Sequence, residues 1–188
     1  SQVYKLAQGL SERGYKVRLA VFRESEYIRC DSFPVPTDVL GIESITSPKN
    51  FLRLYRYARK LNLDKVELVH FFFNDCSIIG PPMFRAAGLR CLISRRDMGF
   101  WYTTLHRRLL PWTGLFVDSV ICNSRAVAEV TRRVERFPER KVAVIYNGYP
   151  ELEVHGEEEL KSDGRNDSSS YFIVGLVANV RPIKRIED

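Results

Sequence analysis

Hydrophobic positions in this chain recur at two different spacings. Val3, Leu6, Ala7 and Leu10 follow the spacing i, i+3, i+4, i+7, which predicts an amphipathic helix that ends at Gly14. The same spacing predicts a second helix from Phe51 to Leu61. Further helices are expected over 77–87, over 104–110 and after a cap at Ser124, with Val127, Val130 and Val134 on the inner face of the last one.

Short apolar runs between these helices predict strands. They cover residues 16–22, 66–73, 89–94, 117–122 and 142–146, and residues 23–47 are expected to form a loop around one short strand. The runs are apolar on both faces, which is typical of a parallel sheet covered by helices on each side. We therefore predict an α/β domain. Because such a domain rarely begins with a helix, we expect a first strand upstream of Ser1.

The end of the chain differs in composition. Residues 151–170 hold seven acidic and two basic residues and show no apolar periodicity, which indicates a flexible linker or insertion. Residues 171–178 (YFIVGLVA) predict a new buried strand, and a helix is expected to begin at Ile183. The predicted organisation is one domain over 1–150, a linker over 151–170 and the start of a second domain over 171–188.

Charge and cysteine usage narrow the function classes. The formal net charge is +6, whereas residues 1–150 alone hold 24 Lys and Arg against 14 Asp and Glu. This basic domain favours nucleic acid, an anionic membrane surface or phosphorylated small molecules as partners. The four cysteines form no CxxC pair, so a disulfide framework and a structural zinc site are not expected. The opening residues lack a signal-peptide pattern, and we expect a cytoplasmic protein.

Five segments, in order, resemble the nucleotide-sugar glycosyltransferases of family 4. They are QVYKLAQGLSERGYKVRLAVF (2–22), VELVHFFFNDCSIIGPPMFRAAGLRCLISRRDMGFW (66–101), DSVICNSRAVAEVTRR (118–133), KVAVIYNGYP (141–150) and VGLVANVRPIKRIED (174–188). The resemblance implies the GT-B fold of two facing Rossmann-like domains, of which this chain carries the acceptor half and the start of the donor half. It also implies retaining sugar transfer from a nucleotide-diphosphate donor, without a cofactor.

Two cations near the end of the chain are candidates for the donor diphosphate. Arg181 and Lys184 follow the predicted strand over 171–178, where cations and free backbone N–H groups suit a diphosphate. By resemblance, Lys184 occupies the position of the family's phosphate-binding lysine. The Gly-rich loop and the paired glutamates of the family have no counterpart within these 188 residues, so we expect the chain alone to be inactive.

Polar and aromatic residues follow the strand over 89–94. Carboxyl ends of parallel strands are where α/β folds place ligands. Arg96 and Asp97 are the candidate catalytic residues, Arg96 as a stabiliser of charge because an arginine cannot act as a base. Phe100 in the same stretch can stack on a sugar ring. The alternative is a salt-bridged loop whose aromatic residues pack into the core.

Other candidate cleft residues are His70, Asn74 and Asn147. His70 lies within the predicted strand over 66–73, Asn74 directly follows it, and Asn147 follows the strand over 142–146. Hydrogen-bonded structural residues and a turn are the alternatives. No His or carboxylate partner stands at metal-ligand spacing, so no protein-built metal site is predicted.

The leading hypothesis is a hexosyltransferase of polysaccharide biosynthesis that acts on a glycan or lipid-linked acceptor and contacts the inner face of the plasma membrane peripherally. The alternative is a non-catalytic basic module that docks on an anionic membrane or on nucleic acid. Nucleic acid is disfavoured because no RNP motif, finger spacing or basic–aromatic stripe is present. The helix over 125–136 is basic on one face, but its apolar face is needed for the core.

Overall fold

A computed structural model describes residues 2–29, 33–44 and 47–148. Contacts divide the chain into two units, Ser1–Gly148 and Tyr149–Asp188. The linker predicted over 151–170 and the start of a second domain predicted over 171–188 lie outside the described residues, and both stay predictions.

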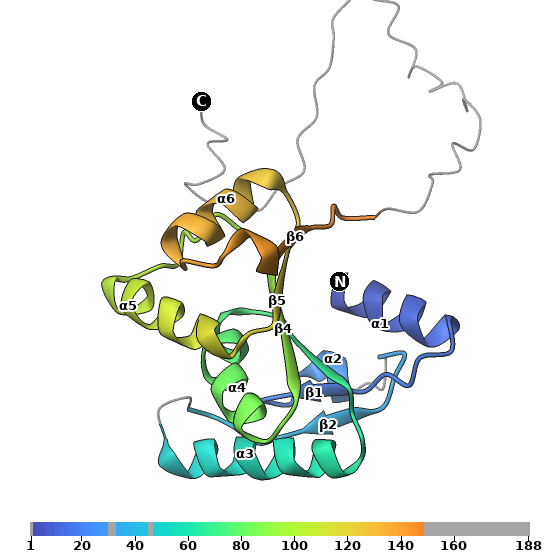
Figure 1. The fold of residues 1–188 in the computed structure, drawn as a ribbon. Helices are drawn as coiled ribbons and strands as arrows, with labels where there is room; N and C mark the ends of the chain where they lie inside the picture. The colour runs from blue at the N-terminus through green and yellow to red at the C-terminus, as the bar shows by residue number, and fades with distance from the viewer. Residues whose placement is uncertain (1, 30–32, 45–46, 149–188) are drawn as a thin grey trace, which may run out of the picture. The chain divides into compact units, whose positions relative to one another are not determined.

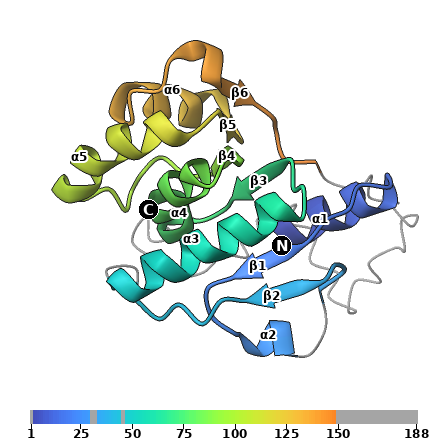
Figure 2. The same ribbon diagram turned by 60° about the horizontal axis from the view of Figure 1, so that its bottom comes forward.

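Helices and strands alternate through the described part of the chain (Figures 1 and 2). The helices are α1 (Gln2–Glu12), α2 (Glu26–Arg29), α3 (Pro48–Leu63), α4 (Asn74–Ala86), α5 (Thr104–Thr113) and α6 (Arg125–Val134), with 3-10 turns η1 (Gly114–Phe116) and η2 (Glu139–Lys141). The strands are β1 (Leu19–Val21), β2 (Thr37–Val39), β3 (Leu68–Phe71), β4 (Arg90–Arg95), β5 (Ser119–Cys122) and β6 (Val142–Val144).

Every described strand pair is parallel. β1 pairs with β2 in a two-stranded sheet, and the other strands form a four-stranded sheet in the order β3-β4-β5-β6. Its register aligns His70 with Leu92, Ser94 with Ile121 and Cys122 with Val144. The prediction of an α/β domain built on parallel strands is confirmed.

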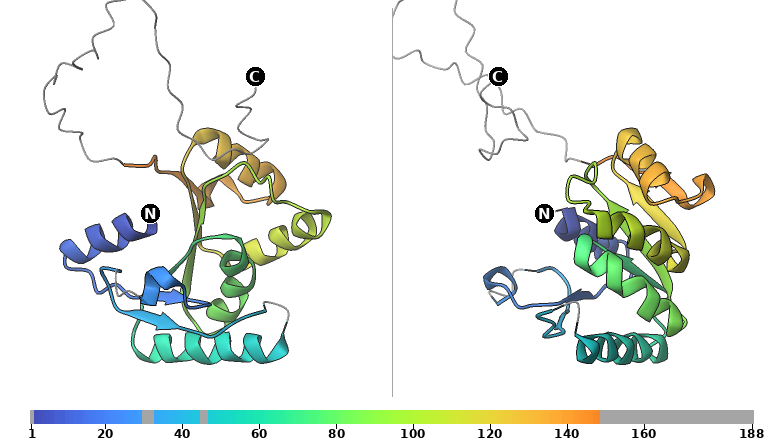
Figure 3. Two further views of the ribbon diagram at one scale, coloured as in Figure 1. Left: turned by 180° about the vertical axis from the view of Figure 1, so that it is seen from behind. Right: turned by 90° about the vertical axis from the view of Figure 1, so that its left-hand side faces the viewer.

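Helices lie on both sides of the larger sheet. Figure 1 places α4 and α5 on one side of β4 and β5 and α1 on the other, and the view from behind in Figure 3 agrees. The core between these layers is apolar, and Cys91 and Cys122 belong to it with no exposed surface, as small hydrophobic residues do. Helix α3 packs against α4.

Helix α4 approaches β3 closely at a glycine. A Cβ atom added to Gly80 would lie 2.3 Å from the ring of Phe71, so only glycine fits there without displacement of the ring. Two prolines, Pro81 and Pro82, follow inside the helix and are buried with it. Each removes one backbone donor from the helix. The tight contact with the sheet therefore holds a helix that is weak in local hydrogen bonding.

The structure differs from the sequence predictions in several places. Helix α4 begins at Asn74, three residues before the predicted start, and α2 forms within a segment predicted as a loop. The buried residues of α6 are Val127, Ala128 and Thr131, so Val127 is buried as predicted whereas Val130 and Val134 are only half-buried. The helix begins after the Ser124 cap as expected, and from that start the buried positions fall at Val127 and one turn later at Thr131.

Candidate functional site

Three loops meet at the carboxyl edge of the four-stranded sheet. Arg96 directly follows β4, Asn123 follows β5 and Asn147 lies three residues beyond β6. The Arg96 guanidinium donates from Nη2 to the Asn147 side-chain oxygen over 2.5 Å. Asn123 donates from Nδ2 to the Arg96 main-chain carbonyl over 3.1 Å. The structure thus brings together Arg96 and Asn147, which are 51 residues apart in the sequence.

The Arg96 side chain is exposed, and among the described residues its only hydrogen-bond partner is an uncharged amide. Its positive charge therefore faces solvent without a carboxylate to neutralise it. Next to it, the side-chain oxygen of Asn123 is a buried acceptor that no described donor satisfies. An exposed guanidinium with further N–H donors at this edge suits a ligand that carries an anionic group.

His70 lies within β3 and contacts the adjacent strand. Its Nε2 atom is 2.8 Å from Ser94 Oγ, and its ring lies 4.2 Å from the Phe72 ring, centroid to centroid. Burial, with a smaller contribution from the nearby Arg96 charge, lowers the pKa of His70 to about 4. The imidazole is therefore neutral at physiological pH and adds no charge beside Arg96.

The loop over 96–103 is organised by Asp97. Its Oδ1 atom accepts hydrogen bonds from the Gly99 backbone N–H (2.8 Å) and from the Trp101 indole N–H (3.0 Å). Gly99 has a φ of +73°, and a Cβ there would lie 2.4 Å from the Tyr102 ring. Asp97, a predicted catalytic residue, thus holds the turn of this loop in the structure. Phe100 at the same turn is 69% exposed and is not part of the core.

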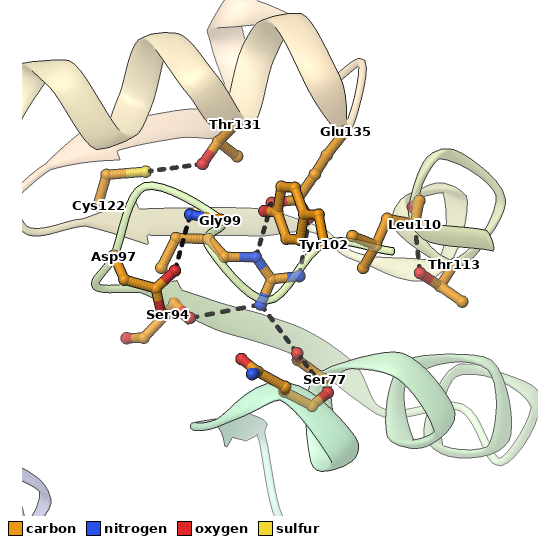
Figure 4. A network of polar contacts seen from close by, with 12 residues as sticks. Ser77, Ser94, Asp97, Gly99, Tyr102, Leu110, Thr113, Cys122, Thr131 and Glu135 are labelled. Carbon is orange, nitrogen blue, oxygen red and sulfur yellow. Dashed lines mark hydrogen bonds and ion pairs between the residues drawn. The ribbon is translucent and has the colours of Figure 1, made fainter. Parts of the chain in front are cut away.

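A buried ion pair lies beneath this loop. Arg95 donates from Nε and Nη2 to the two carboxylate oxygens of Glu135, each over 2.8 Å, and the two side chains are 5% and 0% exposed. Arg95 also donates from Nη1 to Ser77 Oγ over 2.8 Å. The Tyr102 hydroxyl donates to Glu135 Oε1. Figure 4 shows Glu135 near the top of the view, Ser77 near the bottom and Tyr102 between them.

These contacts tie the loop to two helices. Ser77 lies in the first turn of α4 and donates from Oγ to the Asn74 carbonyl over 3.0 Å, and Glu135 directly follows α6. The pKa of Tyr102 is raised, first by burial and then by the Glu135 charge. Burial opposes the charge of Arg95, but hydrogen bonds to Glu135 raise its pKa overall. The Arg95 guanidinium therefore stays ionised.

The sequence model of Glycosyltransferase Family 4 matches residues 1–151. The chain belongs to this family. No curated protein matches the sequence.

Solved structures share the fold of this family 4 chain. Anabaena Alr3699/HepE in complex with UDP and glucose has a TM-score of 0.63 at 15% identity, over 79% of this chain and 40% of that one. MurG of Acinetobacter baumannii has a TM-score of 0.57 at 17% identity, over 81% of this chain and 43% of that one. A glycosyltransferase of Rickettsia africae ESF-5 has a TM-score of 0.62 at 14% identity, over 78% of this chain and 38% of that one. The family 4 chain thus spans about two fifths of the length of these GT-B proteins.

The structure describes some of the predicted site residues of the family 4 chain but not all of them. Arg96, Asp97, Asn147 and His70 lie at or near the carboxyl edge of the larger sheet, and Asn74 opens α4 beside it. Lys184 and Arg181 lie outside the described residues. Within the described ranges, no group of three or more His, Cys, Asp or Glu side chains is arranged to hold a metal ion.

Sequence reasoning missed two residues at this edge of the family 4 chain. Glu135 was hidden because a glutamate at a helix end normally faces solvent, and only the buried Arg95 shows that it does not. Phe73 has a φ of +64° and a ψ of +164°, a conformation that side chains other than glycine rarely adopt, and its ring is 74% exposed. The run Phe71–Phe73 suggested a buried strand end and gave no sign of that strain.

Proposed function

We propose that this chain is the acceptor-binding part of a retaining glycosyltransferase that uses a nucleotide-diphosphate sugar. The observation that carries the proposal is the meeting of Arg96, Asn123 and Asn147 from three successive parallel strands at one sheet edge, in a chain of family 4. HepE structures that hold UDP and glucose, or UDP-glucose, support a nucleotide-sugar donor. We expect hexosyl transfer to a glycan or lipid-linked acceptor in polysaccharide biosynthesis.

In this proposal the described residues position the acceptor, and the donor is gripped elsewhere. The unpaired Arg96 charge faces the reacting groups, where it stabilises negative charge on the departing diphosphate or on the acceptor. Neutral His70 forms a hydrogen bond with a hydroxyl group of the acceptor substrate, and the exposed Phe100 ring stacks on a sugar ring. Lys184 and Arg181 are proposed to hold the donor diphosphate. No cofactor and no metal ion is required by this division of roles.

The proposed location is the cytoplasm, with peripheral contact at the inner face of the plasma membrane. Among the described residues, no helix is both long and apolar enough to cross a bilayer. A lipid-linked acceptor would explain why a basic domain of this kind approaches an anionic surface.

The test compares two arginines at opposite ends of β4. Arg90 begins β4 and Arg96 directly follows its end, and both side chains are exposed. In a version of the protein that carries both domains, transfer from UDP-, GDP- and ADP-sugars is measured for Arg96→Ala and Arg90→Ala. Loss of one charge-assisted hydrogen bond of about 1.5–3 kcal/mol predicts at least a tenfold fall in kcat/KM for Arg96→Ala and little change for Arg90→Ala.

Absence of transfer from all three donor classes by the two-domain version would overturn the proposed reaction. An equal fall in kcat/KM in the two variants would not affect the proposed reaction but would contradict the role of Arg96 in the site. Turnover by the 188 residues alone would contradict the expectation that the donor site lies mostly outside this chain.

A further inference from the structure

Helix α5 carries an apolar stripe that faces solvent. Leu105 (62% exposed), Leu109 and Trp112 (54% exposed) follow one another at intervals of four and three residues, so they lie on one side of the helix. Leu115 in the adjoining turn η1 is 72% exposed. The helix already buries a different side, that of Leu110 and Thr113, so the stripe is not needed for the core.

The charged residues along this segment of the chain have one sign. Residues 98–117 contain no Asp or Glu, and the charged side chains of α5 are those of Arg107 and Arg108, both exposed. Arg108 is three residues from Leu105 and four from Trp112, so it flanks the stripe directly. Apolar side chains, an exposed indole and arginines at the margin are the pattern of a helix that lies in the interface of an anionic bilayer.

We propose that the face formed by Leu105, Arg108, Leu109, Trp112 and Leu115 docks on an anionic lipid surface. The leucines enter the boundary between headgroups and acyl chains, and the Trp112 ring lies at headgroup level, where indoles are enriched. Arg108 faces the lipid phosphates. This assigns a place to the membrane contact in the proposed function and rests on that part of it, but it requires no sugar transfer.

Helix α6 is the less suitable candidate for this contact. It is also basic, but its apolar residues Val127 and Ala128 are buried against the sheet. A second copy of the chain is disfavoured as the occupant of the α5 face as well. A two-fold interface centred on the stripe would bring two Arg108 side chains together, with no acidic residue between positions 98 and 117 to neutralise them.

The first test is sedimentation of the full 188-residue chain with vesicles of phosphatidylcholine, with and without phosphatidylglycerol, at low and at raised salt. We expect binding only to vesicles that contain phosphatidylglycerol, and weaker binding in salt. Binding should shift Trp fluorescence to the blue, and Trp112→Phe should remove most of that shift because Trp101 is already half-buried. Failure of the wild-type chain to bind anionic vesicles would overturn the proposal and leave the proposed transfer reaction untouched.

The second test compares two exposed leucines, one on the α5 stripe and one on α3. Leu105→Glu should lower the vesicle partition coefficient at least tenfold, because an apolar contact is lost and a repelled charge is added. Arg108→Ala should lower it about fivefold. Leu63→Glu at the end of α3, where Leu63 is 75% exposed, introduces the same charge away from the stripe and should change it far less.

Equal losses in Leu105→Glu and Leu63→Glu would show attraction by overall charge and would overturn the assignment to α5. A wild-type dimer in solution that Leu105→Glu converts to a monomer would assign the face to a second copy and would also overturn it. Sugar transfer to a water-soluble acceptor, measured in parallel on the version of the protein that carries both domains, separates both outcomes from a failure of the proposed function.

Discussion

Glu135 offers the sharpest test of the structure because its removal leaves a buried charge without its partner. The carboxylate is fully buried, and it receives two hydrogen bonds from Arg95 and one from Tyr102. In Glu135→Gln, the amide nitrogen of the new side chain must face at least one N–H of Arg95, so a favourable contact becomes a repulsive one. Arg95 is only 5% exposed, and it keeps Ser77 Oγ and the Ser94 main-chain carbonyl as hydrogen-bond partners.

Loss of one partner of a buried ion pair typically costs about 3–5 kcal/mol. For a domain of this size, 1 kcal/mol corresponds to about 2–4 °C in Tm, so the variant should melt roughly 6–20 °C lower. Replacement of both partners, in Arg95→Met with Glu135→Leu, should recover most of the loss, because no unpaired charge remains and the two new side chains can pack. The difference between the double variant and the sum of the single variants gives the coupling free energy.

The assay is urea unfolding followed by circular dichroism and Trp fluorescence, with the m-value used to check that the unfolding transition is comparable. Glu139→Gln is the matched control: Glu139 pairs with Arg132 over 3.3 Å at the surface and is 85% exposed, so its loss should cost less than about 1 kcal/mol. Tyr102→Phe removes one bond to Glu135 and keeps the test informative if Glu135→Gln does not fold. A Glu135→Gln variant within about 1 kcal/mol of wild type, or a double variant no better than the sum of its parts, would refute the reasoning.

Two further predictions concern His70 in β3 and Phe73, the residue before α4. The pKa of His70 is about 4 in the folded chain against 6.5 for a free imidazole, so the unfolded state binds more protons between these values and stability falls as the pH drops through that window. Between pH 7 and pH 5 the free energy of unfolding of the wild-type chain should fall by about 2 kcal/mol more than that of His70→Gln. Urea unfolding at the two pH values measures this difference. If the free energies of unfolding of the two proteins changed equally with pH, the burial of His70 would be contradicted. Phe73→Gly should raise the free energy of unfolding, because glycine accepts the φ of +64° and the relief of such strain is worth about 1–3 kcal/mol. An unfolding midpoint below that of wild type would mean that the exposed ring contributes more than its backbone costs.

Periodicity and capping were sufficient to locate most of the elements. The Ser124 hydroxyl accepts from the Val127 N–H over 3.2 Å as a cap should, and α1 and α3 fall where the apolar spacing predicts them. Except for β4, which is shifted by one residue, the predicted strands were longer than the observed ones because apolar residues continue beyond the last ladder hydrogen bond, as at Phe72 and Phe73. Local pattern therefore fixes the kind of element better than its ends.

The site was only partly accessible to such reasoning. Arg96 and Asn147 could be proposed because each follows a parallel strand, and parallel strands end at the same edge. The pairing of Arg95 with Glu135 could not be predicted from the sequence, because it joins residues that are 40 positions apart and depends on the orientation of α6 over β4. Asp97 was selected for its charge, whereas its bonds to Gly99 and Trp101 depend on the turn that Gly99 permits.

The loop over 96–103 connects the two surfaces on which the proposals rest. It begins at Arg96, is fixed from below by Arg95 and Glu135, and ends at the Thr103 cap of α5, whose exposed stripe starts at Leu105. Nine residues separate Arg96 from Leu105, so their Cα atoms lie at most about 30 Å apart even in an extended chain. A bilayer bound by α5 would therefore lie within that distance of the Arg96 charge, close enough for an acceptor anchored in the lipid to present its polar end there. A longer or looser loop would let the two surfaces move relative to one another, and the buried ion pair opposes such movement because it ties the loop to α4 and α6.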